Sequence, residues 1–125
     1  MDVLLIGGEP TLHPEFMQLL KTLHSSCQFV ETIDVFTNFT ADLKTYLEMA
    51  SLNVNLAISY HSCCGFDFAE KLLELSHFSK IKKNVSEVSL MFEPGNSIEL
   101  TKILKKIINP FRNVIKIWPL YTKLG

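Results

Sequence analysis

The chain has 125 residues, of which 12 are basic and 13 acidic, so its formal net charge is −1. With 47% hydrophobic and 20% charged residues, the composition excludes a disordered or fibrous chain and predicts one globular domain with a substantial core. The near-neutral balance disfavours nucleic acid and acidic membranes as partners, because both attract a basic surface, and the lysine pairs at 82–83 and 105–106 are only short doublets.

The chain also lacks the sequence signals of a membrane or secreted protein. No apolar run reaches the roughly 18 residues that a membrane span needs, and the N-terminus does not resemble a signal peptide. The three cysteines are an odd number, and two of them, Cys63 and Cys64, are adjacent, which disfavours an ordinary structural disulfide. These features predict a reducing compartment and a cytoplasmic location.

Short apolar runs alternate along the chain with amphipathic stripes, a pattern typical of βα units. Strands are expected at residues 3–6, 33–36, 54–58, 88–92 and 114–118. Apolar residues at i, i+3, i+4 and i+7 predict helices over residues 16–23, 43–50 and 100–107, and a less regular stripe predicts another over 68–75. Pro14 suits the start of the first helix, and Asn109-Pro110 is expected to end the last.

This order of elements predicts the α/β class, with about five parallel strands joined by right-handed crossovers. Two architectures fit, a doubly wound sheet or part of a (β/α) barrel. The strand near residues 52–61 favours the barrel, because its alternation leaves one polar face, made by Asn53, Asn55, Ala57, Ser59 and His61. A doubly wound sheet would be apolar on both faces, so the polar face is expected to line a lumen that receives a polar ligand.

The strongest functional signal is Gly7-Gly8-Glu9-Pro10-Thr11-Leu12-His13-Pro14, directly after the first apolar run. The two glycines allow a ligand to approach the backbone closely at the end of a strand. Glu9 offers a carboxylate suited to an ammonium group. The structural alternative is a tight turn with an exposed glutamate.

This octapeptide resembles the second-strand motif of the radical S-adenosylmethionine (SAM) enzymes. Downstream, 34–38 resembles the third strand of that family, which commonly ends in Thr-Asn-Gly, and 57–62 resembles the fourth. The segments 88–93 and 115–120 occupy the places of the fifth and sixth strands. The resemblance implies a partial (β/α) barrel of the radical SAM type, as a single domain over residues 1–125 in which the first strand, the cluster loop and the first helix are missing.

The resemblance also implies a chemistry. In the complete family a reduced [4Fe-4S] cluster cleaves SAM to a 5′-deoxyadenosyl radical, while the protein orients the cofactor. On this resemblance the chain is the SAM-orienting portion of such an enzyme, with SAM as its small-molecule cofactor. The residues expected to bind SAM are Gly7, Gly8, Glu9, Thr37, Asn38 and Ser59.

Two departures from the family limit this expectation. Phe39 stands where the family has the glycine that follows Thr37-Asn38. The CxxxCxxC motif that holds three irons of the cluster is absent, so no metal ligand and no catalytic residue is assigned in this chain. Activity would require a partner chain or an N-terminal segment that completes the barrel, and the unpaired edge of the first strand is expected to make the isolated chain marginally stable or oligomeric.

Several other residues carry weaker expectations. His61 could contact a substrate or be a hydrogen-bonded structural histidine, and His13 is expected to cap the first helix. Cys63 and Cys64 are expected to be inert loop thiols, since two cysteines and one histidine make an incomplete metal site. Glu93 could face the cavity or lead a turn. Trp118 and Tyr121 could stack on adenine, but aromatic core packing is the expected role.

Two alternatives to a radical enzyme fragment remain open at this point. The chain could be a non-catalytic module that binds SAM, a nucleotide or a partner protein on the same scaffold. It could also be an unrelated doubly wound domain that binds phosphate at the Gly-Gly turn, although GxGxxG and Gly-Lys-Ser/Thr motifs are both missing.

Overall fold

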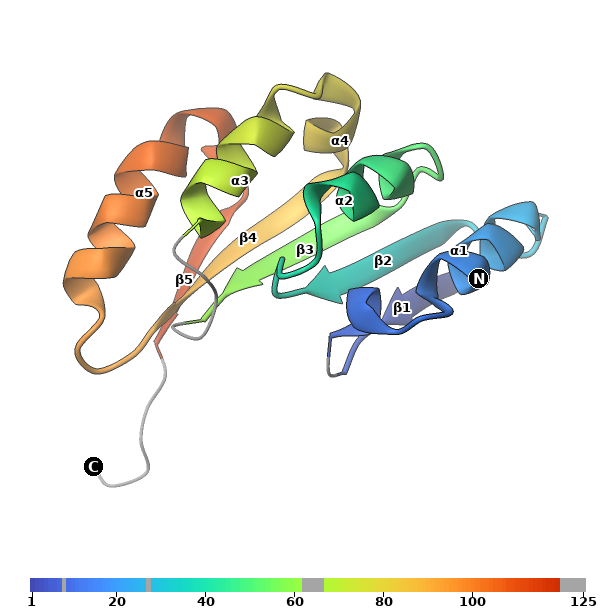
Figure 1. Cartoon of the computed structure of the whole chain (residues 1–125), viewed down its shortest axis with the longest axis horizontal. Helices are drawn as coiled ribbons and strands as arrows, with labels where there is room; N and C mark the ends of the chain where they lie inside the picture. The colour runs from blue at the N-terminus through green and yellow to red at the C-terminus, as the bar shows by residue number, and fades with distance from the viewer. Residues whose placement is uncertain (8, 27, 62–66, 120–125) are drawn as a thin grey trace.

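The computed structural model describes residues 1–7, 9–26, 28–61 and 67–119, and Figure 1 shows its course. The strands are β1 (Asp2–Leu5), β2 (Thr32–Thr37), β3 (Asn55–Tyr60), β4 (Val85–Phe92) and β5 (Ile115–Pro119). The helices are α1 (Phe16–Ser25), α2 (Leu43–Ala50), α3 (Phe68–Ser76), α4 (Ser79–Asn84) and α5 (Ser97–Phe111). A short 3-10 helix, η1 (Pro10–Leu12), follows β1.

The five strands form one sheet in the sequential order β1-β2-β3-β4-β5, and every neighbouring pair is parallel. Because each strand lies next to the preceding one and always in the same direction across the sheet, right-handed crossovers place every connecting helix on the same face of the sheet. Figure 1 shows the helices gathered in this way over one face of the sheet. This arrangement confirms the α/β class with five parallel strands and excludes the doubly wound alternative for the described residues.

The sheet is open, because β1 and β5 are its two edges and do not pair with each other. The core lies between the sheet and the helices. Alternate residues of the strands point into it, among them Val35, Leu56, Ile58, Val88 and Leu90, which are almost fully buried. They meet the apolar stripes of the helices, which supply Leu20, Tyr46, Met49, Leu72, Leu75 and Ile107. The periodicity in the sequence therefore identified the buried faces of both strands and helices.

The opposite face of the sheet has no helix over it in the described residues, and we call it the open face. It carries Asp34, whose carboxylate accepts a hydrogen bond from Asn55 at 3.0 Å, and the half-buried Ser59. Phe36 is 42% exposed there. The predicted polar face is confirmed for Asn55, Ala57 and Ser59 as the uncovered side of β3, whereas Asn53 (φ +55°) and His61, also expected on it, lie outside the strand.

Two details of the sequence prediction are wrong. The last helix does not end at Asn109-Pro110, because Pro110 lies inside α5, which continues to Phe111. Pro110 cannot donate to the carbonyl four residues earlier, so the helix loses one hydrogen bond there, and it ends one residue later at Phe111. Trp118 does not pack in the core: it is 48% exposed, and its indole N–H donates to Ser89 Oγ at 3.2 Å. On the edge strand β5 only one neighbouring strand is present to cover it.

Candidate functional site

The motif begins at the carboxyl end of β1, where the chain turns away from the sheet. Gly7 has φ +91°, a left-handed conformation that side chains other than glycine rarely adopt. A Cβ added there would meet no atom within 4 Å, so the backbone at this strand end borders open space. The sequence argument for close approach of a ligand is therefore compatible with the geometry at Gly7. Gly8 lies outside the described residues.

Glu9 lies just beyond Gly7, and its half-buried carboxylate joins the ends of β1 and β2. Its Oε2 accepts the backbone N–H of Asn38 at 2.7 Å. The hydroxyl of Thr37 lies 2.8 Å from both carboxylate oxygens. Thr11 in η1 adds its hydroxyl, 3.0 Å from Oε1, and its backbone N–H at 3.4 Å. One carboxylate thus links the η1 turn to the loop after β2.

Four donor groups therefore converge on Glu9: two from Thr11, one from Thr37 and one from Asn38. A carboxylate offers about four lone-pair positions, so these internal bonds nearly exhaust its hydrogen-bonding capacity. They orient the carboxylate through charge-assisted hydrogen bonds. The result is a fixed negative charge at the carboxyl edge of the sheet.

Behind Thr37 lies Tyr46, a residue of α2 with no exposed surface. Its hydroxyl is 3.1 Å from Thr37 Oγ1 and accepts the backbone N–H of Ala41 at 3.3 Å. Burial raises the pKa of the Tyr46 hydroxyl, and the nearby negative charge of Glu9 acts in the same direction. The hydroxyl therefore remains protonated at neutral pH.

The loop after β2 contains Phe39, which has φ +65° although it is not glycine. Its ring is buried, with its centroid 4.5 Å from the Tyr46 ring and 5.9 Å from the Phe68 ring. Side chains bind both polar groups of its backbone: Thr37 Oγ1 accepts the N–H at 3.0 Å, and Lys71 Nζ donates to the carbonyl at 2.9 Å. Packing and hydrogen bonds thus hold phenylalanine in a left-handed conformation that ordinarily favours glycine.

The structure brings together three of the residues predicted to bind SAM, namely Glu9, Thr37 and Asn38, with Gly7 close to them in the chain. Ser59 is separate from this group. Although its neighbour Ile58 pairs with Thr37 in the sheet, Ser59 points to the open face and Thr37 to the helical face. Thr37 is only 3% exposed, and its hydroxyl is bonded to Glu9.

The histidines near the strand ends have local partners. His61 Nε2 lies 3.5 Å from Ser59 Oγ, on the open face. His13 Nδ1 accepts the backbone N–H of Glu15 at 3.1 Å, immediately before α1. The expectation that His13 caps the first helix is wrong, because Glu15 occupies the cap position of α1; the His13 ring instead accepts the backbone N–H of that cap residue. Cys27, Cys63, Cys64 and Tyr121 lie outside the described residues.

The turn after β4 uses Glu93 as a turn residue, one of its two expected roles. Its backbone N–H donates to Asn96 Oδ1 at 2.9 Å, and Asn96 Nδ2 donates to the carbonyl of Met91 at 3.0 Å. The side chain of Asn96 thus closes the turn that leads into α5.

The residues joined around this carboxylate, which we call the Glu9 cluster, are Glu9, Thr11, Thr37, Asn38 and Tyr46. Sequence reasoning does not predict two of them as site residues: Thr11, which lies within the octapeptide, and Tyr46, which lies within the helix expected over 43–50. A polar hydroxyl on the buried face of a helix was the available signal for Tyr46, because such a group requires a hydrogen-bonding partner.

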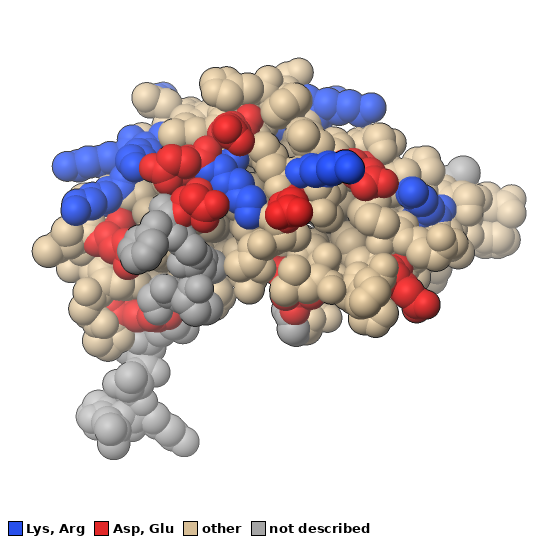
Figure 2. All heavy atoms as spheres, in the orientation of Figure 1, with Lys and Arg blue, Asp and Glu red and all other residues tan. Residues whose placement is uncertain are grey.

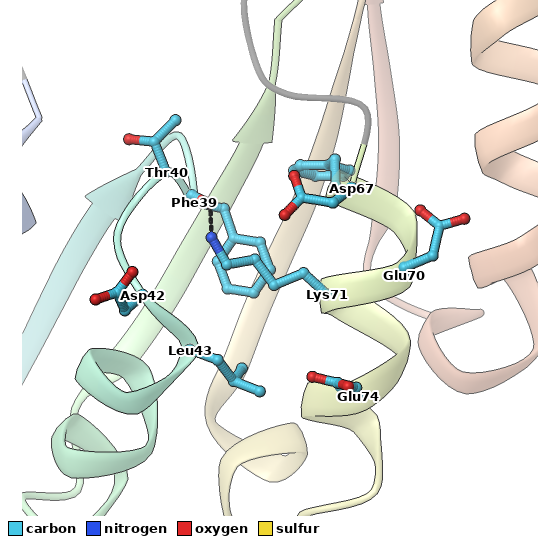
Figure 3. A pocket seen from close by; sticks show the side chains of 9 residues that line it. Phe39, Thr40, Asp42, Leu43, Asp67, Glu70, Lys71 and Glu74 are labelled. Atoms are coloured by element: carbon cyan, nitrogen blue, oxygen red, sulfur yellow. Dashed lines mark hydrogen bonds between the residues drawn. The ribbon is translucent and has the colours of Figure 1, made fainter.

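A cavity of about 590 Å³ lies elsewhere, between the start of α2 and α3 (Figure 3). Its side chains include Lys71, which points to the carbonyl of Phe39, and the carboxylates of Asp42, Asp67, Glu70 and Glu74. Figure 2 shows lysines interspersed with acidic residues over this face of the molecule. The cavity is on the helical side and does not include Glu9.

Among the described residues, no group of three or more histidine, cysteine or acidic side chains is placed to hold a metal ion. They therefore do not fit a [4Fe-4S] cluster, and all three cysteines lie beyond them. In the same part of the chain no helix combines the length and apolar character that crossing a membrane requires.

No known protein-family model matches the sequence, and no curated protein matches it either. The fold and the Glu9 cluster together define an open, singly wound α/β sheet with a fixed carboxylate at its carboxyl edge.

Proposed function

We propose that this chain binds the methionine part of SAM at the carboxyl edge of its sheet, as the SAM-orienting portion of a radical SAM enzyme. The observation that carries the proposal is the position of Glu9: its ionised carboxylate is held at the adjoining ends of two parallel strands. Ligands of open α/β sheets bind beyond the carboxyl ends of the strands, so the charge lies where a ligand is expected.

The chemistry of SAM matches this edge. Its methionine part carries an ammonium group, a carboxylate and the sulfonium, which sum to one positive charge, so a fixed carboxylate attracts it when the ammonium group faces Glu9. Because internal donors nearly fill the lone pairs of Glu9, its contribution is mainly the field of its charge. Gly7 provides open backbone beside that charge, where an ammonium group can reach carbonyl oxygens.

The partial (β/α) barrel belongs to the same proposal. The sequential parallel sheet with helices on one face has the arrangement of a barrel segment, and its open face would then line the lumen. Completion of that barrel, and the cluster that the reaction needs, would come from a partner chain or from another segment. When present, the cluster would supply the electron that cleaves SAM; this chain would hold the methionine part in position.

The proposal is tested by isothermal titration calorimetry of the chain with SAM. Glu9→Gln, which removes the charge but retains the shape, is expected to weaken binding about tenfold or more, as loss of a charge-assisted contact does. Glu15→Gln is the matched control, because Glu15 is an exposed carboxylate of the neighbouring turn. It should bind SAM as the unmodified chain does.

A second titration uses 5′-methylthioadenosine, which lacks the amino-acid part of SAM. Its affinity should be the same for Glu9→Gln and for the unmodified chain, which also checks that the variant is folded. Absence of SAM binding by the unmodified chain, or equal SAM affinity of Glu9→Gln and Glu15→Gln, would refute the proposal.

One observation favours a second candidate, a partner-binding module. The open face exposes the large apolar side chains of Leu4, Phe36 and Trp118. The strands at the two edges of the sheet, β1 with Leu4 and β5 with Trp118, each have only one neighbouring strand among the described residues. An apolar surface with an unpaired strand edge is suited to covering by another chain. Light scattering across a range of protein concentrations tests it, since a strict monomer would argue against self-association at this surface.

A further inference from the structure

The hydrogen-bond chain behind Glu9 has a defined direction, which follows from counting protons. An ionised carboxylate can only accept, so Thr37 must donate its single hydroxyl proton to Glu9. Thr37 Oγ1 also accepts the backbone N–H of Phe39. Tyr46 lies 3.1 Å from the same oxygen, and Thr37 has no second proton, so Tyr46 must be the donor.

The far end of the chain is consistent with this direction. The oxygen of Tyr46 accepts the N–H of Ala41, so its own proton is available to donate. Thr37 lies 3.1 Å away, and the Thr11 hydroxyl, which also donates to Glu9, is a second neighbour of the Tyr46 hydroxyl. The order is therefore Ala41 N–H to Tyr46 O–H to Thr37 O–H to the carboxylate of Glu9. Donors in such a chain polarise one another, so each bond strengthens the next.

From this geometry we infer that Tyr46 is a positioning residue for Glu9: through Thr37 it directs a hydroxyl proton at the carboxylate and so fixes where that negative charge lies. The inference deepens the proposed function and rests on it for the identity of the ligand. Tyr46 does not itself reach the ligand, because it is fully buried.

Three elements meet in this arrangement: the η1 turn with Glu9, the loop after β2 with Thr37, and α2 with Tyr46. Rotation of Thr37 would break its bond to Glu9, and the bond from Tyr46 opposes that rotation. The ring of Tyr46 is in turn held against Phe39. The register between α2 and the strand ends thus determines the orientation of the carboxylate.

The direct test is NMR of the Asn38 amide, whose N–H donates to Glu9 Oε2 and so reports the position of the carboxylate. In Tyr46→Phe, which keeps the ring, the Asn38 proton is expected to shift upfield and to exchange with solvent about threefold to tenfold faster. Thr37→Val should give the same change, whereas Thr37→Ser should retain the signal because it restores the hydroxyl.

Tyr60→Phe is the matched control. Tyr60 is also a buried tyrosine whose hydroxyl donates to a carboxylate, that of Glu99, but on the α5 side of the core. If loss of a buried hydroxyl acted only through general stability, Tyr60→Phe would disturb Asn38 equally. An unchanged Asn38 signal in Tyr46→Phe, or equal changes in both variants, would overturn the inference.

The affinity for SAM separates the inference from the proposed function. Tyr46→Phe should bind SAM about threefold to tenfold more weakly, and Tyr60→Phe should bind normally. If the unmodified chain binds no SAM, the proposed function fails while the Asn38 signal still decides whether Tyr46 positions Glu9. If SAM binds Tyr46→Phe and the unmodified chain equally, the proposed function survives and the positioning role for SAM is refuted.

Discussion

The hydroxyl of Thr37 donates to the carboxylate of Glu9 at 2.8 Å, although 28 positions separate the two residues in the chain. This bond joins the ends of two parallel strands at the edge where the proposed ligand would bind. It also makes the cluster both a structural element and a candidate site, so mutations in it are expected to change stability as well as binding.

Loss of the Thr37 hydroxyl should lower the stability of the fold. Thr37→Val leaves the carboxylate, the Tyr46 hydroxyl and the Phe39 amide without a partner they have in the folded state. We expect the free energy of unfolding to fall by about 1–3 kcal/mol, the cost of unsatisfied buried groups. Urea denaturation followed by circular dichroism measures it.

Thr32→Val is the control for this change, because Thr32 lies in the same strand but its hydroxyl bond to Asp2 is exposed. It should change the unfolding free energy by less than about 0.5 kcal/mol. Equal losses in the two variants would mean that the Thr37 hydroxyl has no special role.

At position 39 a glycine variant should be more stable than an alanine variant, which is the reverse of their usual order of stability. Phe39→Ala loses the buried ring and keeps the left-handed backbone, whereas Phe39→Gly loses the ring but relieves that strain. Both should be destabilised by a few kcal/mol, with the glycine variant about 1 kcal/mol more stable than the alanine variant.

The control for position 39 is a site where an alanine variant is expected to be more stable than a glycine variant. Leu72, a buried residue in the middle of α3, is suitable, and there Leu72→Gly should be about 0.5–1 kcal/mol less stable than Leu72→Ala. Thermal or urea unfolding of the four variants gives both differences. The same ranking at both positions would contradict a strained φ at Phe39.

The open face should contribute stability that depends on pH. The Lys116 ammonium, which donates at 2.8 Å, and then the Ser89 hydroxyl lower the pKa of Glu87 below its usual range. A lowered folded-state pKa means that ionised Glu87 stabilises the fold above the ordinary pKa of a glutamate. That stabilisation is lost as the pH falls through the lowered value.

Lys116→Met should therefore make unfolding less dependent on pH in the acidic range below about pH 5, with a loss of roughly 0.2–1 kcal/mol at neutral pH. Urea midpoints measured from pH 3 to 7 would show it. Lys105→Met, at an exposed position of α5, should leave the profile unchanged. Parallel profiles for Lys116→Met and the unmodified chain would contradict the contribution of this ion pair.

Trp118 reports on the open face, because it is the single tryptophan of the chain and is half exposed. In a dilute monomer its fluorescence should be readily quenched by acrylamide, and quenching should decrease as concentration rises if copies cover this face. Phe36 lines the same hollow of the open face as Trp118, so Phe36→Ser should abolish the dependence of quenching on protein concentration. Phe29→Ser is the control, because Phe29 is an exposed apolar residue between α1 and β2, and it should leave that dependence unchanged. Protected fluorescence at every concentration would show that the face is covered within a single chain.

Local patterns in the sequence determined a large part of this fold. Apolar periodicity depends on which face of an element is buried, so it predicted five strands, the four longer helices and the inward face of β3. The short elements η1 and α4 were missed because two turns or fewer carry too little periodicity. Gly7 and the carboxylate of Glu9 likewise indicated a candidate ligand-binding site at the end of β1.

Which side chains meet there depends on the packing of elements that are distant in the chain. The convergence of Thr37 and Tyr46 on Glu9 depends on strand register and on how α2 packs over the sheet, and neither is encoded in a local pattern. The same holds for Phe39, whose positive φ is maintained by distant contacts, and for Trp118, whose exposure follows from its place on an edge strand. The sequence by itself specified the elements and the motif; long-range packing determined the geometry of the carboxylate.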